Sequence, residues 1–181
     1  MRYGRRLGRG MWTLDTSRST VTFWVRYLSV QRVSGSFTRW SGTLDWNAAD
    51  PSASVVDVVI DAASIKTDTE ARDKELRHHG FLEVDKFPEM KFRSRSVARA
   101  GENRLRVVGD LTLHGHTGEI ALDVEADPSA LDPGATSAHF VARTTVPRKV
   151  YGVRMPGLDF AVFIGYDIHV ELDIQAHESR T

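Results

Sequence analysis

The sequence predicts an all-β fold, an extended antiparallel barrel of about eight strands with a short helical insert that covers one end. Two observations support this prediction. Apolar and polar residues alternate with a period of two along most of the chain, which is typical of half-buried strands. Short segments rich in Gly, Pro, Asp and Asn separate these runs, as expected for turns between neighbouring antiparallel strands.

The alternating runs follow one another closely, so strands that are adjacent in the chain are expected to pair. A set of this kind hides all of its edges only when it closes into a barrel. The runs that we expect to form strands cover residues 21–27, 35–46, 55–60, 90–97, 104–113, 118–126, 138–146 and 160–174.

One stretch, residues 63–94, departs from this pattern. A short helix is predicted over about 69–77, with Asp68 or Thr69 as its cap and acidic residues in its early turns. Gly80 and Pro88 mark breaks beyond it. We expect this insert to dock at the open end or flank of the barrel. Three apolar side chains then act either as a lid over that end or as a permanent anchor: Phe81, Leu82 and Phe87.

Composition limits the classes of function. The 181 residues suit one domain, and 24 basic residues balance 24 acidic ones. A neutral chain has no overall field that would steer it to nucleic acid. Its most basic hairpin, residues 93–106, lacks the interleaved aromatic residues of a stacking platform. The absence of Cys excludes disulfides, thiol catalysis and zinc sites built on Cys.

The first ten residues are predicted to form a basic, disordered tail, with residues 11–181 as a single domain. This tail carries four Arg and no acidic residue. No apolar segment follows these arginines, so the sequence as written predicts a cytoplasmic protein rather than one with a secretory leader. A periplasmic or secreted location is the alternative if translation starts elsewhere.

Strand parity predicts which apolar side chains point inward. These side chains either fill a dry core or line a cavity, and the alternation alone favours the dry core. The predicted inward residues, together with Phe81 of the insert, are Val21, Phe23, Val25, Tyr27, Phe37, Val56, Val58, Met90, Phe92, Leu105, Val107, Leu111, Leu113, Ile120, Leu122, Phe140, Ile164 and Ile168.

Four segments, taken together, resemble the YceI-like family, which is described as polyisoprenoid-binding and lipocalin-like. They are residues 33–42 with Val-Ser-Gly-x-Phe, residues 63–94, residues 109–117 with Gly-Asp-Leu-Thr-Leu-His-Gly, and residues 148–153 with Arg-Lys-Val-Tyr-Gly-Val. The resemblance covers about residues 12–175. The chain departs from the family at Arg18-Ser19 and Tyr27-Leu28, where members commonly carry His-Ser and His-Leu.

The resemblance implies a lipocalin-like barrel whose tunnel holds an isoprenoid lipid, such as a polyprenyl or quinone-type tail. It implies binding, storage or transport of that lipid without catalysis and without a required cofactor. The alternatives are a hydrolase or metal-dependent enzyme that uses the same cavity, and an interaction protein with a dry core. No G-x-S-x-G elbow, phosphate-binding Gly loop or HExxH motif is present, so we assign no catalytic residue.

Four polar residues are candidates for more specific contacts. Arg72 and Arg148 are candidates to bind a polar head group, although we favour the alternative of an ion pair that fixes the insert to the barrel rim. His114 and His116 are weak candidates for metal ligands, since His-x-His on a strand points both rings the same way. Flanking glycines make an ordinary polar turn the alternative.

Tryptophans supply the last prediction. By parity, Trp24, Trp40 and Trp46 fall on outward faces, and exposed tryptophans are enriched at interfaces. We therefore expect a homodimer. The competing interpretation is a rim that touches a membrane transiently for lipid exchange.

Overall fold

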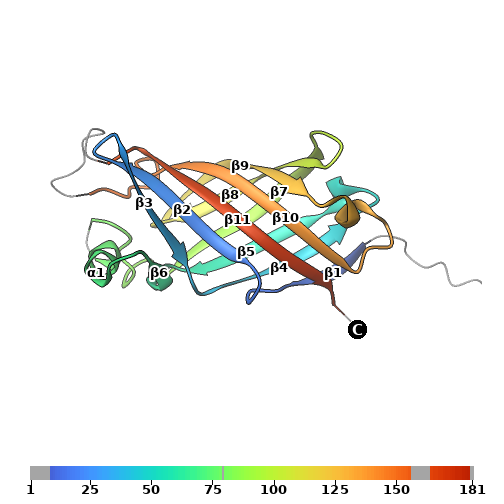
Figure 1. Cartoon of the computed structure of the whole chain (residues 1–181), viewed down its shortest axis with the longest axis horizontal. Coiled ribbons are helices and arrows are strands. Elements are labelled where there is room, and N and C mark those ends of the chain that lie inside the picture. The colour runs from blue at the N-terminus through green and yellow to red at the C-terminus, as the bar shows by residue number, and fades with distance from the viewer. Residues whose placement is uncertain (1–8, 79, 156–163, 180–181) are drawn as a thin grey trace, which may run out of the picture.

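Eleven strands form a single antiparallel sheet that closes on itself in the computed structural model, which describes residues 9–78, 80–155 and 164–179 (Figure 1). Closure comes from pairing of the first strand with the last. The strands are β1 (Arg9–Leu14), β2 (Thr20–Tyr27), β3 (Gln31–Phe37), β4 (Trp40–Asn47), β5 (Val55–Asp61), β6 (Ile65–Lys66), β7 (Glu89–Arg99), β8 (Arg104–Leu113), β9 (His116–Ala126), β10 (Ser137–Pro147) and β11 (Asp167–Glu178).

These eleven strands make an eight-stranded barrel because three of its strands are interrupted. β1 and β2 pair with successive parts of β11, at residues 176–178 and 169–173. Only two residues separate β3 from β4, and a single 3₁₀ turn, η2 (Ala62–Ser64), separates β5 from β6. Each of these three pairs acts as one strand of the barrel, so the predicted eight-stranded barrel is confirmed.

Polar side chains hold two of these interruptions together. The Asp61 carboxylate accepts a hydrogen bond from the Ala63 amide at the start of η2 and pairs with Arg39, whose Nη2 lies 2.8 Å away. Thr38 donates to the Ser64 carbonyl through its amide and its hydroxyl, each at 3.2 Å. The bend between β3 and β4 is therefore bonded to the bend between β5 and β6.

The barrel interior at the end nearer β1 is solidly packed. Trp46 is 3% exposed and meets Phe140 edge-on, with ring centroids 5.1 Å apart. The Trp46 indole donates a 2.9 Å hydrogen bond to the Ala130 carbonyl, in the 3₁₀ turn η3 (Pro128–Leu131). Trp46 satisfies its one polar group in this way, as buried tryptophans usually do. The loop that carries η3 therefore packs onto the core of this end.

The outward placement predicted for Trp46 is therefore wrong. Trp46 shares its face of β4 with Leu44, which is also buried in this core. Trp40 is partly buried and packs against the same core. Trp24 does lie on the outer surface, stacked on His169 at 3.8 Å with the Arg32 guanidinium 4.1 Å above its ring. The homodimer and the membrane contact stay predictions.

The predicted helix is confirmed as α1 (Glu70–Arg77), which lies beside β6 at the opposite end of the barrel (Figure 1). Buried polar contacts attach it there. The Asp73 carboxylate accepts 2.6 Å hydrogen bonds from the amide and the hydroxyl of Thr67. Arg77 donates to the carbonyls of Ala63 and Ile65, at 2.8 and 3.1 Å. Burial of Asp73 raises its pKa, but the Thr67 hydrogen bonds outweigh this effect and hold the pKa below its usual value.

The first strand begins inside the stretch that the sequence assigned to an N-terminal tail. β1 begins at Arg9, within the stretch expected to be a disordered tail, while residues 1–8 lie outside the described part of the chain. Among the described residues, no helix has the length and apolar character needed to cross a membrane.

The Asp73 contact predicts a specific pH dependence of stability. Asp73→Asn should lower the free energy of unfolding by about 2–3 kcal/mol near neutral pH, since it weakens two hydrogen bonds to a buried charge. Because the folded pKa lies below the ordinary 3.8, this contribution is complete above that value and is lost as the pH falls through the folded pKa. Urea unfolding across a pH series measures the difference between the two proteins.

The matched control is Asp68→Asn, which removes an exposed carboxylate that pairs with Arg72 one turn along the chain. An exposed pair contributes less than about 1 kcal/mol, so this variant should change stability little. A stability difference for Asp73→Asn that is as large in acid as at neutral pH would contradict the assignment.

Candidate ligand cavity

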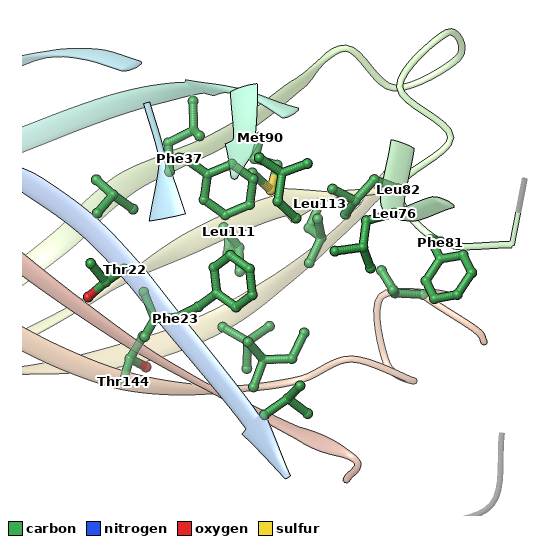
Figure 2. A pocket seen from close by; sticks show the side chains of 18 of the residues that line it. Thr22, Phe23, Phe37, Leu76, Phe81, Leu82, Met90, Leu111, Leu113 and Thr144 are labelled. Carbon is green, nitrogen blue, oxygen red and sulfur yellow. The ribbon is translucent and has the colours of Figure 1, made fainter. Parts of the chain in front are cut away.

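A cavity of about 370 Å³ occupies the half of the barrel next to α1 (Figure 2). Its volume lies at the lower end of the roughly 300–1,000 Å³ typical of small-molecule sites. Phe81, Leu82 and Leu76 of the insert stand at one end, whereas Thr22 and Thr144 stand at the other side of the pocket in Figure 2. The insert therefore contributes part of the wall rather than packing wholly outside the barrel.

The cavity wall is almost entirely apolar. Two of its few polar side chains, Thr22 and Thr144, donate their hydroxyls to the strand carbonyls of Glu171 and Ala121, at 3.2 and 2.8 Å. Within the described part of the chain, the only charged side chains in the lining are Arg72 and Glu75 of α1. A ligand in the depth of the cavity meets hydrocarbon, so the site is suited to an apolar chain.

Two Phe rings of the cavity wall lie over glycines of neighbouring strands. A Cβ atom on Gly35 would approach the Phe23 ring to 2.5 Å, and one on Gly109 would approach the Phe92 ring to 2.7 Å. Each ring thus occupies the space that a side chain at the glycine would need. A glycine opposite each ring makes room for it, so large residues coexist with a cavity.

Strand parity predicted which residues face the barrel interior, but not which of them lie in the hollow half. The structure places every predicted inward residue on the cavity wall except four, and it places Phe81 there too. The four exceptions are Val56, Leu105, Val107 and Phe140, which belong to or pack against the solid core at the β1 end. Their faces are inward as predicted, but the period of two does not say which half of the barrel a residue occupies.

The prediction also missed several lining residues. Ile60, Val146, Val170 and Leu172 share a strand face with predicted residues, so the same parity could have found them. Others come from the insert or from loops, where no periodicity points to them: Leu76, Leu82, Val153 and Met155. Leu82 had been expected only as a lid or anchor.

The arginine candidates have different positions. Arg72 lies at the cavity wall, where it pairs with Asp68 one turn earlier. Arg148 is fully buried, and its guanidinium donates to the carbonyls of Gly165, Val153 and Ile164 at 2.9, 3.1 and 3.3 Å. A head-group contact through Arg148 is therefore not what the structure shows. Arg148 joins the described segment that ends at Met155 to the one that begins at Ile164.

Tyr151, which follows Arg148 closely in the chain, covers a gap in the strand pairing of the barrel wall. β9 and β10 pair in register only between residues 123–126 and 140–143. Beyond that point, the Tyr151 hydroxyl reaches the Gly118 carbonyl at 3.3 Å, and the ring packs against Gly118 where a side chain would crowd it. Burial raises the pKa of Tyr151, and the nearby Asp110 charge raises it further.

The histidine pair forms a turn that holds the insert. His114 and Gly115 both have positive φ, +51° and +73°, as a two-residue hairpin turn between β8 and β9 requires. His114 Nε2 lies 2.7 Å from Glu83 Oε2, and the His114 ring contacts Phe87 at 4.6 Å between centroids. His116 Nδ1 donates to the His114 carbonyl at 2.9 Å.

These contacts assign the two histidines to a structural role. In the part of the chain that the structure describes, no group of three or more His, Cys, Asp or Glu side chains is placed to hold a metal ion. Phe87 was expected either to cover the barrel end or to anchor the insert, and it packs on the β8–β9 turn, which fits the anchor. It anchors the insert from outside the cavity.

Several solved structures have a similar fold. Burkholderia cenocepacia BcnA matches with a TM-score of 0.82 at 17% identity, over 90% of this chain and 98% of that chain. A Campylobacter jejuni YCEI protein matches with a TM-score of 0.75 at 24% identity, over 86% and 90%. A polyisoprenoid binding domain from Saccharophagus degradans matches with a TM-score of 0.68 at 16% identity, over 96% and 100%. At these identities the likeness concerns the fold.

Sequence comparison goes further than the fold. A UPF0312 protein of Pseudomonas savastanoi pv. phaseolicola is 37% identical over 138 residues, which are 76% of this chain and 72% of that protein. One from Vibrio cholerae is 30% identical over 163 residues, or 88% and 85%. The fold and the cavity define the class of protein as a closed antiparallel barrel with an internal apolar cavity. The chain belongs to the YceI-like family, whose domain profile matches residues 12–176.

The two arginines should respond differently to mutation. Arg148→Met leaves three buried carbonyls without their donor, so it should lower the free energy of unfolding by about 3 kcal/mol or more. Arg72→Met removes an exposed ion pair and should cost less than about 1 kcal/mol. Chemical denaturation of both variants measures this contrast, and an Arg148→Met protein as stable as the wild type would contradict the structural role.

Proposed function

We propose that this protein binds an isoprenoid lipid in the barrel cavity and stores or transports it without changing it chemically. One observation supports the proposal above all: the cavity is enclosed by apolar side chains from the strands and the insert, and its few polar groups lie at its edges or are bonded to the backbone. The structural neighbour named as a polyisoprenoid binding domain supports the choice of ligand class.

The energetics suit a ligand held by its hydrocarbon part. Each buried methylene contributes about 0.8 kcal/mol, so roughly ten buried carbons contribute about 8 kcal/mol before other terms. Loss of ligand freedom offsets part of this gain. Since about 8 kcal/mol corresponds to a micromolar dissociation constant, we expect affinities in the micromolar range or weaker for a short tail.

The charge at the cavity favours a neutral lipid over a fatty acid. A carboxylate buried away from water needs a cationic or hydrogen-bonding partner. Arg72, the one cationic side chain that the described residues contribute to the lining, already pairs with Asp68, and Glu75 lies in the same helix. A ligand with an uncharged tail and a head group outside the cavity avoids this unfavourable burial.

The same lining gives little support to an enzyme. Among the described residues, the wall holds no His, Cys, Ser or Lys side chain. Both Thr hydroxyls donate to backbone carbonyls, and no neighbouring base activates them in the lining. Nucleophilic catalysis needs a nucleophile and a base within hydrogen-bond reach of each other. Binding without chemistry is the function that this arrangement supports.

A substitution that fills the cavity tests the proposal. Val146→Phe places a ring in the lining and should weaken the binding of farnesol by at least about tenfold, because the ligand loses buried area. Displacement of a fluorescent apolar probe measures the affinity. The thermal midpoint should stay close to that of the wild type.

The matched control adds the same atoms at an exposed site. Val30→Phe, in the turn between β2 and β3, changes a side chain that is 85% exposed and should leave farnesol affinity unchanged. A folded Val146→Phe protein that binds farnesol as well as the wild type would show that the ligand lies elsewhere.

A further inference from the structure

The barrel interior changes from hollow to solid at one level, and all the strands that can be compared agree on it. On β11 the inward residues Ile168, Val170 and Leu172 line the cavity, whereas Ile174 packs into the solid core. On β9 the change falls between Leu122 and Val124. The two series sit on different strands, so their agreement shows a floor that crosses the barrel.

On β5 and β8 the change from cavity to solid core falls at the same level. On β5, Val58 lines the cavity and Val56 packs against the solid core. On β8, Leu111 lines the cavity and Val107 is part of the core, with Gly109 between them under the Phe92 ring. The four residues that were predicted to line the cavity but belong to the solid half all lie on the core side of this floor.

Three side chains form the floor itself, because they line the cavity and also pack in the solid core: Phe92, Leu122 and Leu172. Below them the space is occupied by Trp46 and Phe140 in edge-to-face contact. The Trp46 hydrogen bond to Ala130 holds this pair in place. A chain that passed the floor would have to displace close-packed side chains, which a protein interior resists.

The size of the cavity above the floor limits the length of the ligand chain that fits inside it. At the roughly 30 Å³ that a water-sized group takes up in a liquid, the cavity of about 370 Å³ holds on the order of twelve heavy atoms. This corresponds to two or three five-carbon isoprene units. The wall extends by about 13 Å along β11, from Ile168 to Leu172, and by about 20 Å along β2, from Val21 to Tyr27, which suits a short chain as well.

We propose that Phe92, Leu122 and Leu172 form a chain-length stop, so that the cavity takes two or three isoprene units of a ligand and leaves the rest outside. This inference rests on the proposed lipid-binding function and adds its length specificity. Units beyond the stop remain in water and contribute no buried area. Affinity should therefore rise with chain length at first and then level off.

Prenols of two, three, four and eight isoprene units test the stop on the wild-type protein, by displacement of a fluorescent apolar probe. Affinity should rise by at least about tenfold from two to three units, because more hydrocarbon is buried, and change by less than about threefold from four to eight units. A steady rise through eight units would overturn the stop but leave the lipid-binding function standing. Failure of every prenol to bind would overturn both.

A pair of variants on one strand locates the stop. Leu172→Ala removes part of the floor and should make the four-unit prenol bind about tenfold more tightly than the three-unit prenol. Ile174→Ala, two residues further along the same face, removes a similar volume below the floor and should keep the wild-type profile. Equal profiles for the two variants would contradict the assignment of Leu172, and the wild-type series decides on the stop even if one variant does not fold.

Discussion

Closure of the sheet is the constraint on which the rest of the structure depends. Because β1 pairs with β11, every second side chain of the barrel strands points into one shared interior. The sizes of those side chains then decide where the interior is solid and where it is hollow. Trp46 and Phe140 fill one half, whereas the other half holds the apolar cavity.

Polar contacts, rather than apolar packing alone, fasten the segments around the hollow half. Asp73 and Arg77 attach α1 to the bend between β5 and β6, and the His114–Glu83 contact attaches the rest of the insert to the β8–β9 turn. Arg148 fixes the loop that follows β10. These charges are directed at the backbone or at each other, so the cavity they enclose stays apolar.

The sequence predicted the fold more fully than the site. The period of two identified most of the strands and the inward faces, and the breaks at Gly80 and Pro88 identified the insert. The period does not predict where along the barrel an inward residue lies. Val56 and Val58 have the same parity, yet only Val58 lines the cavity. Arg148 shows a second limit, because a charged residue in a loop motif gives no sign that backbone carbonyls surround it.

Native mass spectrometry of the freshly purified protein, followed by solvent extraction and mass analysis of what is released, tests the central claim most directly. The account predicts a bound neutral lipid whose mass differs between species by whole isoprene units, and it predicts uptake of added prenol by any unoccupied protein. A protein that carries no lipid and takes up neither prenols nor quinones would contradict the claim and indicate that the cavity is not a lipid site.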